Sequence, residues 1–249
     1  MNKIIAANWK MHKTAQEAEK TIAEMKTMLG GKAPSGKEVI IFAPFTALEA
    51  ASRAAAGFAA VGAQNLYPAD HGAFTGEIAP GMIKACGATC VLTGHSERRH
   101  ILHEDEREVG VKTSFALENG LDVMLCIGET LEERESGLLS NVLERQLVLG
   151  TSFDKNLLEK ARLMIAYEPV WAIGTGKTAT SEDIAETHKI CRRLMRACLG
   201  SKARRIPLLY GGSVKPANAS EILSLDNVDG VLVGGSSLKA EQFCPIINA

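Results

Sequence analysis

The chain has 249 residues, 46% of them hydrophobic, and a formal net charge of −1. This length suits one large α/β domain or two small ones, and the near-zero charge argues against nucleic acid or an anionic membrane as the main partner. The first residues become polar too early for a signal peptide, and no apolar run has the length of a membrane span.

Short apolar runs alternate with helical patterns along the chain. The expected strands are residues 4–8, 38–43, 59–63, 90–93, 122–127, 163–167, 206–210 and 230–233. The expected helices include residues 14–29, 46–56, 105–118, 138–148, 182–199 and 217–225. Most of the strand runs are apolar without strict alternation, which is typical of parallel strands covered on both faces.

Eight strand–helix units without a linker predict one closed (β/α)8 barrel domain over residues 1–249. A doubly wound open sheet is the structural alternative. It fits less well, because no Gly-x-Gly-x-x-Gly follows the first strand.

The cysteines show neither the paired spacing of a zinc site nor a disulfide framework. They are Cys86, Cys90, Cys126, Cys191, Cys198 and Cys244. Cys126 lies in an expected strand, and Cys191 and Cys198 lie in an expected helix. We therefore expect reduced core thiols and a cytoplasmic protein.

In a (β/α)8 barrel the active site lies where strands end and helix-bound loops begin. The polar residues and glycine turns just after the expected strands are Asn8, Lys10, His95, Glu97, Glu168, Gly211–Gly212–Ser213 and Gly234–Gly235–Ser236. Barrel closure would bring these groups to one mouth.

Glu168 ends an apolar strand, and Pro169 stops a helix from starting there. The loop that follows has an apolar front and closes at Thr180 or Ser181, either of which can cap a helix. This arrangement is typical of a base under a lid, because burial raises the proton affinity of a carboxylate. A solvated loop charge is the common alternative. Trp171 occupies the first glycine position of a phosphate-binding loop, which excludes nucleotide binding there.

The glycine turns after the last two strands allow backbone N–H groups to approach an anion, with helix dipoles behind them. They occupy the usual phosphate site of the fold, although each turn alone can be a plain tight turn.

His95 precedes a helix start, and the positive helix end disfavours its charged form. A neutral imidazole still donates a hydrogen bond to a carbonyl oxygen. His100 and His103 also suggest a metal site, but they lie beyond the turn that holds His95. We expect them to be surface histidines, and we expect no metal.

Lys10 has three possible roles: a structural ion-pair partner, a Schiff-base amine or a fixed charge for an anionic substrate. Asn8 and Glu97 nearby favour a charged, hydrogen-bonded lysine.

Several stretches together resemble the triosephosphate isomerase family. They are NWKM at 8–11, GHSERR at 94–99, AYEPVWAIGTG at 166–176, YGGS at 210–213 and VGG at 233–235. The resemblance covers the whole chain, in order and in phase with the eight units. It implies interconversion of dihydroxyacetone phosphate and D-glyceraldehyde 3-phosphate through an enediol(ate), without cofactor or metal.

The resemblance also implies roles for residues. Glu168 would be the base and His95 the electrophile, while Lys10 and Asn8 would bind substrate and stabilise the negative charge of the enediol(ate). The phosphate would be held by Gly174, Ser213, Gly234 and Gly235. The lid and supporting residues would be Trp171, Tyr210 (the latch of the closed lid), Glu97 and Cys126.

The family is dimeric, which implies a homodimer with an interface loop over residues 64–77. Thr75 would reach the partner's active site, and Glu77 would pair with Arg98 across the interface. Without the family, an ordinary surface loop is the simpler interpretation.

Three positions depart from the family pattern: His12, Thr93 and Ser236. None of them changes a catalytic group.

The alternatives to the isomerase are another phosphate-binding barrel enzyme, such as a Schiff-base aldolase using Lys10, and a barrel without catalysis.

Overall fold

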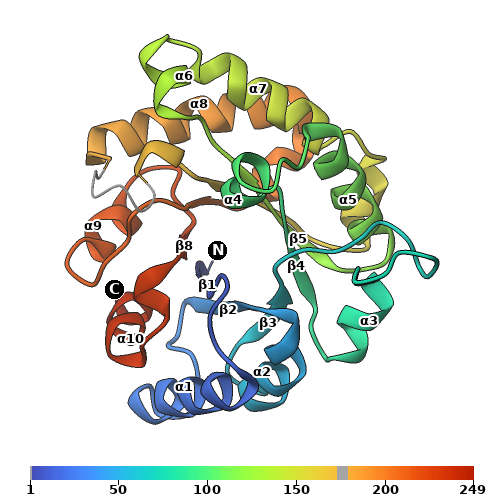
Figure 1. Cartoon of the computed structure of the whole chain (residues 1–249). Helices are drawn as coiled ribbons and strands as arrows, with labels where there is room; N and C mark the ends of the chain where they lie inside the picture. The colour runs from blue at the N-terminus through green and yellow to red at the C-terminus, as the bar shows by residue number, and fades with distance from the viewer. Residues whose placement is uncertain (1, 173–178) are drawn as a thin grey trace.

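The computed structural model describes residues 2–172 and 179–249, in which eight parallel strands close into a barrel in the order β1 to β8 (Figure 1). The strands are β1 (Lys3–Asn8), β2 (Lys37–Ala43), β3 (Ala60–Ala63), β4 (Cys90–Thr93), β5 (Asp122–Ile127), β6 (Leu163–Tyr167), β7 (Leu208–Tyr210) and β8 (Gly230–Val233). β8 pairs with β1 and completes the ring, with Gly230 opposite Ile4. The predicted closed barrel is confirmed, and the open sheet is excluded.

Most of the helices lie around the outside of this ring, whereas the short α4 (Ser96–His100) lies close to the strands in this view (Figure 1). The helices are α1 (Ala15–Met28), α2 (Leu48–Ala55), α3 (Pro80–Ala85), α4 (Ser96–His100), α5 (Glu106–Glu118), α6 (Leu131–Glu135), α7 (Leu139–Gly150), α8 (Ser181–Leu199), α9 (Ala219–Ser224) and α10 (Ala240–Asn248). None of the described helices is both long enough and apolar enough to cross a membrane.

Two groups of apolar side chains bury the strands on both faces, which explains why the strand runs do not alternate with polar residues. One group fills the barrel, with members such as Ile4, Phe42 and Leu92. The other packs between the strands and the helices, with members such as Ile5 and Val91. Successive residues of one strand therefore belong to different cores.

Two prolines account for differences from the expected elements. β7 begins at Leu208, two residues later than expected, and Pro207 before it has no N–H for the ladder. α10 was not among the expected helices, and it continues through Pro245. Proline inside a helical pattern normally indicates an end or a kink.

The start of α8 fixes where the loop after β6 rejoins the barrel. Thr180 is the N-cap, its side chain accepts from the N–H of Asp183, and the carboxylate of Asp183 accepts from the N–H of Thr180. This reciprocal pair satisfies N–H groups that have no partner within a helix. Of the two expected caps, Thr180 is the one used.

Candidate active site

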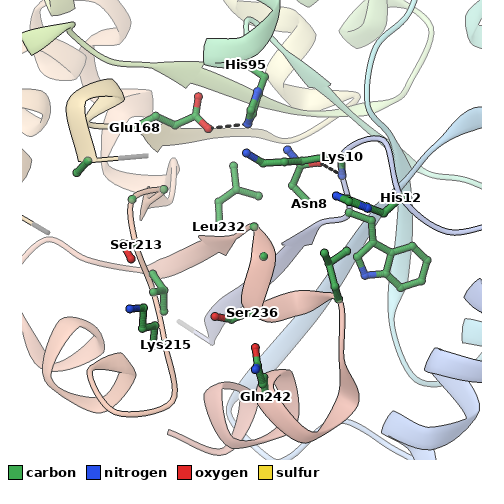
Figure 2. A pocket seen from close by; sticks show the side chains of 18 residues that line it. Asn8, Lys10, His12, His95, Glu168, Ser213, Lys215, Leu232, Ser236 and Gln242 are labelled. Atoms are coloured by element: carbon green, nitrogen blue, oxygen red, sulfur yellow. Dashed lines mark hydrogen bonds and ion pairs between the residues drawn. The ribbon is translucent and has the colours of Figure 1, made fainter. Parts of the chain in front are cut away.

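A cavity of about 470 Å³ opens at the carboxyl ends of the strands (Figure 2). The predicted site residues that line it are Asn8, Lys10, His95, Glu168, Ser213, Gly234 and Gly235. They follow β1, β4, β6, β7 and β8, so groups far apart in the chain meet at one mouth because the barrel closes. The predicted convergence therefore holds for these residues. Gly174 lies outside the described residues.

Glu168 and His95 form a buried pair in the cavity wall. Glu168 Oε1 lies 3.0 Å from His95 Nε2, and Figure 2 shows the two side chains pointing toward one another. The other carboxylate oxygen accepts a hydrogen bond from the backbone N–H of Ser96, also at 3.0 Å. The residues are only 2% and 5% exposed, so their electrostatic interaction is weakly screened by solvent.

The pKa of Glu168 is lowered, which differs from the expectation based on burial alone. Burial raises this pKa, but the imidazole of His95, the N–H of Ser96 and the ammonium of Lys10 lower it by more. The carboxylate therefore stays ionised at neutral pH, as a base must. The carboxylate of Glu168 is buried as predicted, but burial does not set the direction in which its pKa is shifted.

Hydrogen bonds assign the proton on His95. Burial lowers the pKa of His95, and the carboxylates of Glu168 and Glu97 raise it by more. However, the backbone N–H of Glu97 donates to Nδ1 at 3.2 Å, so a proton on Nδ1 would face another donor. We therefore assign the neutral ring with its proton on Nε2, donated to Glu168. This is the ring form expected at a helix start.

The backbone at Lys10 is held in an uncommon conformation. Its φ is 53°, in the left-handed region that a residue with a side chain seldom adopts. Asn8 Oδ1 accepts from the N–H of Lys10 at 2.9 Å, and Gln64 Nε2 donates to the Lys10 carbonyl at 2.9 Å. These bonds stabilise the turn that directs the Lys10 side chain into the cavity.

The ammonium of Lys10 forms an ion pair with Glu97, whose Oε1 lies 2.6 Å from Nζ. Glu97 itself does not line the cavity. This contact fits a charged lysine, as an ion-pair partner or as a fixed positive charge, better than a Schiff-base lysine, which is kept desolvated and neutral.

The glycine turns after β7 and β8 form another part of the wall, below the Glu168–His95 pair in Figure 2. A Cβ at Gly211 would lie 2.8 Å from Cγ of Glu168, so a glycine there lets the turn pack directly against the base. Gly234 packs against the Lys10 side chain, with its ideal Cβ 3.4 Å from Cε. The turns are thus placed beside the catalytic candidates.

The supporting residues lie just outside the cavity. Trp171 Nε1 donates to Glu129 Oε1 at 2.9 Å. The Tyr210 hydroxyl is buried and has no hydrogen-bond partner among the described residues. Cys126 is buried inside the barrel, where burial, together with the nearby charge of Glu168, raises the pKa of its thiol well above the usual value.

The interface candidates lie away from this chain's own cavity. Thr75 is exposed in the loop between β3 and α3, which projects from the barrel in Figure 1. Glu77 and Arg98 line a separate hollow of about 420 Å³. Within the chain, Arg98 Nε already pairs with Glu104 Oε2 at 3.3 Å.

Sequence reasoning missed several contacts of the site. The side chain of Gln64 donates to a backbone carbonyl, and Ser96 donates through its own backbone N–H, and no side-chain motif indicates such contacts. Lys215 and Gln242 also line the cavity, as Figure 2 shows. The carboxylate of Glu129 is buried behind the mouth. Its position two residues after β5 is the only feature of the sequence that indicates a role for it.

The family departures and the other histidines are also located. His12 and Ser236 line the cavity, whereas His100 and His103 are exposed, as expected. Thr93 is buried, and its hydroxyl lies 2.9 Å from that of Thr113 on α5. The polar group at this position is therefore hydrogen-bonded.

Fold and site together define a (β/α)8 barrel with a carboxylate–imidazole pair beside glycine turns suited to an anion. The family model for triosephosphate isomerase matches residues 3–249. Over the full length of both chains, the sequence is 54% identical to the triosephosphate isomerase of Nitratidesulfovibrio vulgaris (strain DSM 19637 / Miyazaki F) and 56% identical to that of Oleidesulfovibrio alaskensis. The crystal structure of triosephosphate isomerase from Bartonella henselae superposes with a TM-score of 0.86 at 38% identity, covering 99% of this chain and 98% of that one. The chain therefore belongs to the triosephosphate isomerase family.

Proposed function

We propose that this chain, as a single barrel domain over residues 1–249, interconverts dihydroxyacetone phosphate and D-glyceraldehyde 3-phosphate through an enediol(ate). The observation that carries the proposal is the contact of Glu168 Oε1 with His95 Nε2 in the wall of the cavity that the glycine turns also line. A substrate whose phosphate sits at those turns has its carbonyl and the adjacent C–H bond within reach of this pair.

Glu168 takes the proton from the carbon beside the carbonyl and returns it to the neighbouring carbon. The Nε2–H of His95 polarises the carbonyl and exchanges protons between the two oxygens. The ammonium of Lys10 and the amide of Asn8 stabilise the negative charge that develops on the enediol(ate). Only protons move, so the reaction balances without a cofactor.

Glu168 has to exchange a hydrogen bond before it reacts. Both carboxylate oxygens are engaged, Oε1 with His95 and Oε2 with the N–H of Ser96. At least one of these contacts breaks when the carboxylate turns toward a substrate C–H bond. Substrate binding is thereby coupled to movement of the base.

The phosphate is assigned to the backbone N–H groups of Ser213, Gly234 and Gly235, together with Gly174, which lies outside the described residues. Tyr210 is the latch for the loop after β6, and Trp171 is part of that loop. The buried Tyr210 hydroxyl, which has no partner in the described part of the chain, supports the latch role because it offers a donor.

We also propose that the chain acts as a homodimer, with Thr75 reaching the partner's active site and Glu77 pairing with Arg98 of the partner subunit. Large apolar side chains that are exposed on this chain support this, because exposed apolar surface is typical of protein interfaces. They are Met11 (94% exposed), Ile101 (67%), Leu102 (60%), Val111 (54%) and Phe74 (42%). We expect the specific activity to fall when the protein is diluted below the dimer dissociation constant. Sedimentation and turnover measured at the same concentrations test this. Full specific activity in a demonstrated monomer would refute the contribution of Thr75.

The six cysteines are all free, which supports placing the reaction in a reducing compartment, the cytoplasm.

A coupled assay with D-glyceraldehyde 3-phosphate tests the proposed reaction, with competitive inhibition expected from a two-carbon phosphate acid that imitates the enediolate. A well-folded chain with no turnover of either triose phosphate would contradict it. Borohydride trapping with substrate separates the aldolase alternative, because an adduct at Lys10 would require Schiff-base chemistry.

A further inference from the structure

Arg99 lies on α4 beside the catalytic pair, yet it does not line the cavity. Its Nε donates to the carbonyl of Gly94 at 2.7 Å, and its Nη2 donates to the carbonyl of Cys126 at 3.2 Å. A Cβ at Gly94 would lie 2.6 Å from Nη2, so the guanidinium packs directly on this backbone. One side chain therefore joins the ends of β4 and β5.

Both backbone positions that Arg99 holds lead directly to the catalytic pair. Gly94 is the residue before His95, so the carbonyl that accepts from Arg99 belongs to the peptide unit that enters the imidazole-bearing residue. The residue after Cys126 is Ile127, whose carbonyl accepts a hydrogen bond from the backbone N–H of Glu168 at 2.7 Å. The rigid planar fork of a guanidinium is suited to holding two such acceptors at a fixed separation.

Arg99 also places a positive charge behind the base. Burial lowers the pKa of Arg99, while Glu106, Cys126, Glu168 and Glu104 oppose that lowering, and a guanidinium remains charged in proteins. Its Nη1 atom is buried without a hydrogen-bond partner in residues 2–172 and 179–249, so part of this charge is not used in direct hydrogen bonds. Glu168 and Arg99 interact electrostatically, so this charge adds to that of Lys10 at the carboxylate.

We propose, on the basis of the isomerase function above, that Arg99 is a positioning residue of the active site. Its guanidinium fixes the ends of β4 and β5 under His95 and Glu168, and its charge adds to the groups that favour the Glu168 carboxylate in a buried wall. Arg99 touches no substrate atom, so its effect falls on kcat and on the protonation of the base, and KM changes little.

The test compares Arg99→Met, which removes the charge, with Arg99→Lys, which keeps the charge and loses the fork. The direct readout is the pH titration of the Glu168 carboxyl carbon by ¹³C NMR, assigned by its disappearance in Glu168→Gln. Arg53→Met is the matched control, because Arg53 pairs only with Glu19 at the surface among the described residues.

In Arg99→Met we expect the Glu168 titration midpoint to rise by roughly one pH unit, because a nearby positive charge favours the carboxylate. The acid limb of kcat/KM should move with it. In Arg99→Lys the midpoint should stay near that of the parent, while kcat falls because the two carbonyls are no longer held. Arg53→Met should leave both unchanged.

An unchanged midpoint in a folded Arg99→Met would overturn the proposal, even if stability and kcat both fell. If Arg99→Met does not fold, Arg99→Gln provides the same neutral comparison with a donor for Gly94. The NMR titration needs no turnover, so an inactive parent would refute the isomerase while the role of Arg99 in ionising Glu168 is still decided.

Discussion

Two carboxylates are buried at the same mouth of the barrel and have opposite characters. Glu129 follows β5 and is 0% exposed, and its Oε1 accepts from Tyr167 Oη (3.0 Å), Trp171 Nε1 (2.9 Å) and Arg134 Nη1 (3.0 Å). Glu168 follows β6 and is 2% exposed, with His95 and the N–H of Ser96 as its partners.

The difference lies in access to the cavity. Glu168 lines the cavity, whereas Glu129 does not and is surrounded by side chains of the protein itself. Burial of a carboxylate therefore does not identify a base; an open side toward the substrate does. Glu129 serves the architecture, because it ties the end of β6 and the start of the following loop to α6 through Arg134.

The largest effect is expected for Glu168→Asp, which withdraws the carboxylate by one methylene. kcat should fall on the order of 10²–10³-fold with little change in KM, because proton transfer depends steeply on the position of the base. Steady-state assays in both directions measure it. Glu129→Asp is the matched control, and the fold decrease in its kcat should be less than about a tenth of that in Glu168→Asp. Near-normal kcat in Glu168→Asp would remove Glu168 as the base.

Glu129→Leu should have the largest effect on stability. It leaves Arg134 and the buried Tyr167 hydroxyl without the acceptor that they share, which should lower the free energy of unfolding by about 4 kcal/mol. Urea denaturation measures this loss, and Glu129→Gln should lose less because it retains an acceptor. A stability near that of the parent for Glu129→Leu, together with a collapse of kcat in Glu129→Gln, would reverse the roles of the two carboxylates.

The same contrast explains what sequence reasoning could predict. The strands could be predicted because parallel strands covered on both faces are continuous apolar runs, as in residues 122–127 and 163–167. Asn8, Lys10, His95 and Glu168 could be predicted as a group because barrel closure forces strand ends together, and because their flanking residues are specific to one family.

The remainder depends on contacts that leave no pattern in the sequence. Gln64 acts on a carbonyl of Lys10, and Ser96 acts through its own N–H, which every residue but proline carries. The direction of the Glu168 pKa shift required the distances to His95 and Ser96, since burial alone predicts the opposite. Pro245 inside α10 shows a local rule overridden by packing, with Phe243 and Ile246 buried on either side.

The contrast between a reactive and a structural group extends to histidine. His188 on α8 is 0% exposed, and its ring lies 5.9 Å from that of Tyr167 and 6.3 Å from that of Tyr210, centroid to centroid. Burial lowers the pKa of His188 to about 4, despite a hydrogen bond with the Asn227 carbonyl. Unlike His95, it has no ion pair with a carboxylate among the described residues, and the charge of Asp229 raises its pKa by less than burial lowers it.

A depressed histidine pKa makes stability depend on pH in a defined direction. The unfolded chain binds a proton at this position below about pH 6.5, while the folded chain does so only near pH 4, so stability is lost as pH falls through this window. The loss should total on the order of 3 kcal/mol, and His188→Gln should remove this component. Urea midpoints from pH 7 to pH 4 measure it; equal slopes in parent and variant would contradict a neutral buried His188.

The smallest effect is expected at Thr180, whose cap reaches the Glu129 network through Asp183. Asp183 accepts from the N–H of Thr180, and its Oδ1 also accepts from Arg134 Nη2 at 2.8 Å. Thr180→Ala should cost about 1 kcal/mol by loss of the N-cap, and Thr180→Ser should restore most of it. A double-mutant cycle that combines Thr180→Ala with Glu129→Gln then tests whether Thr180 and Glu129 are energetically coupled through Arg134. A coupling above about 0.5 kcal/mol would make the helix cap part of the structural carboxylate's network, whereas additive losses would confine Glu129 to its own contacts.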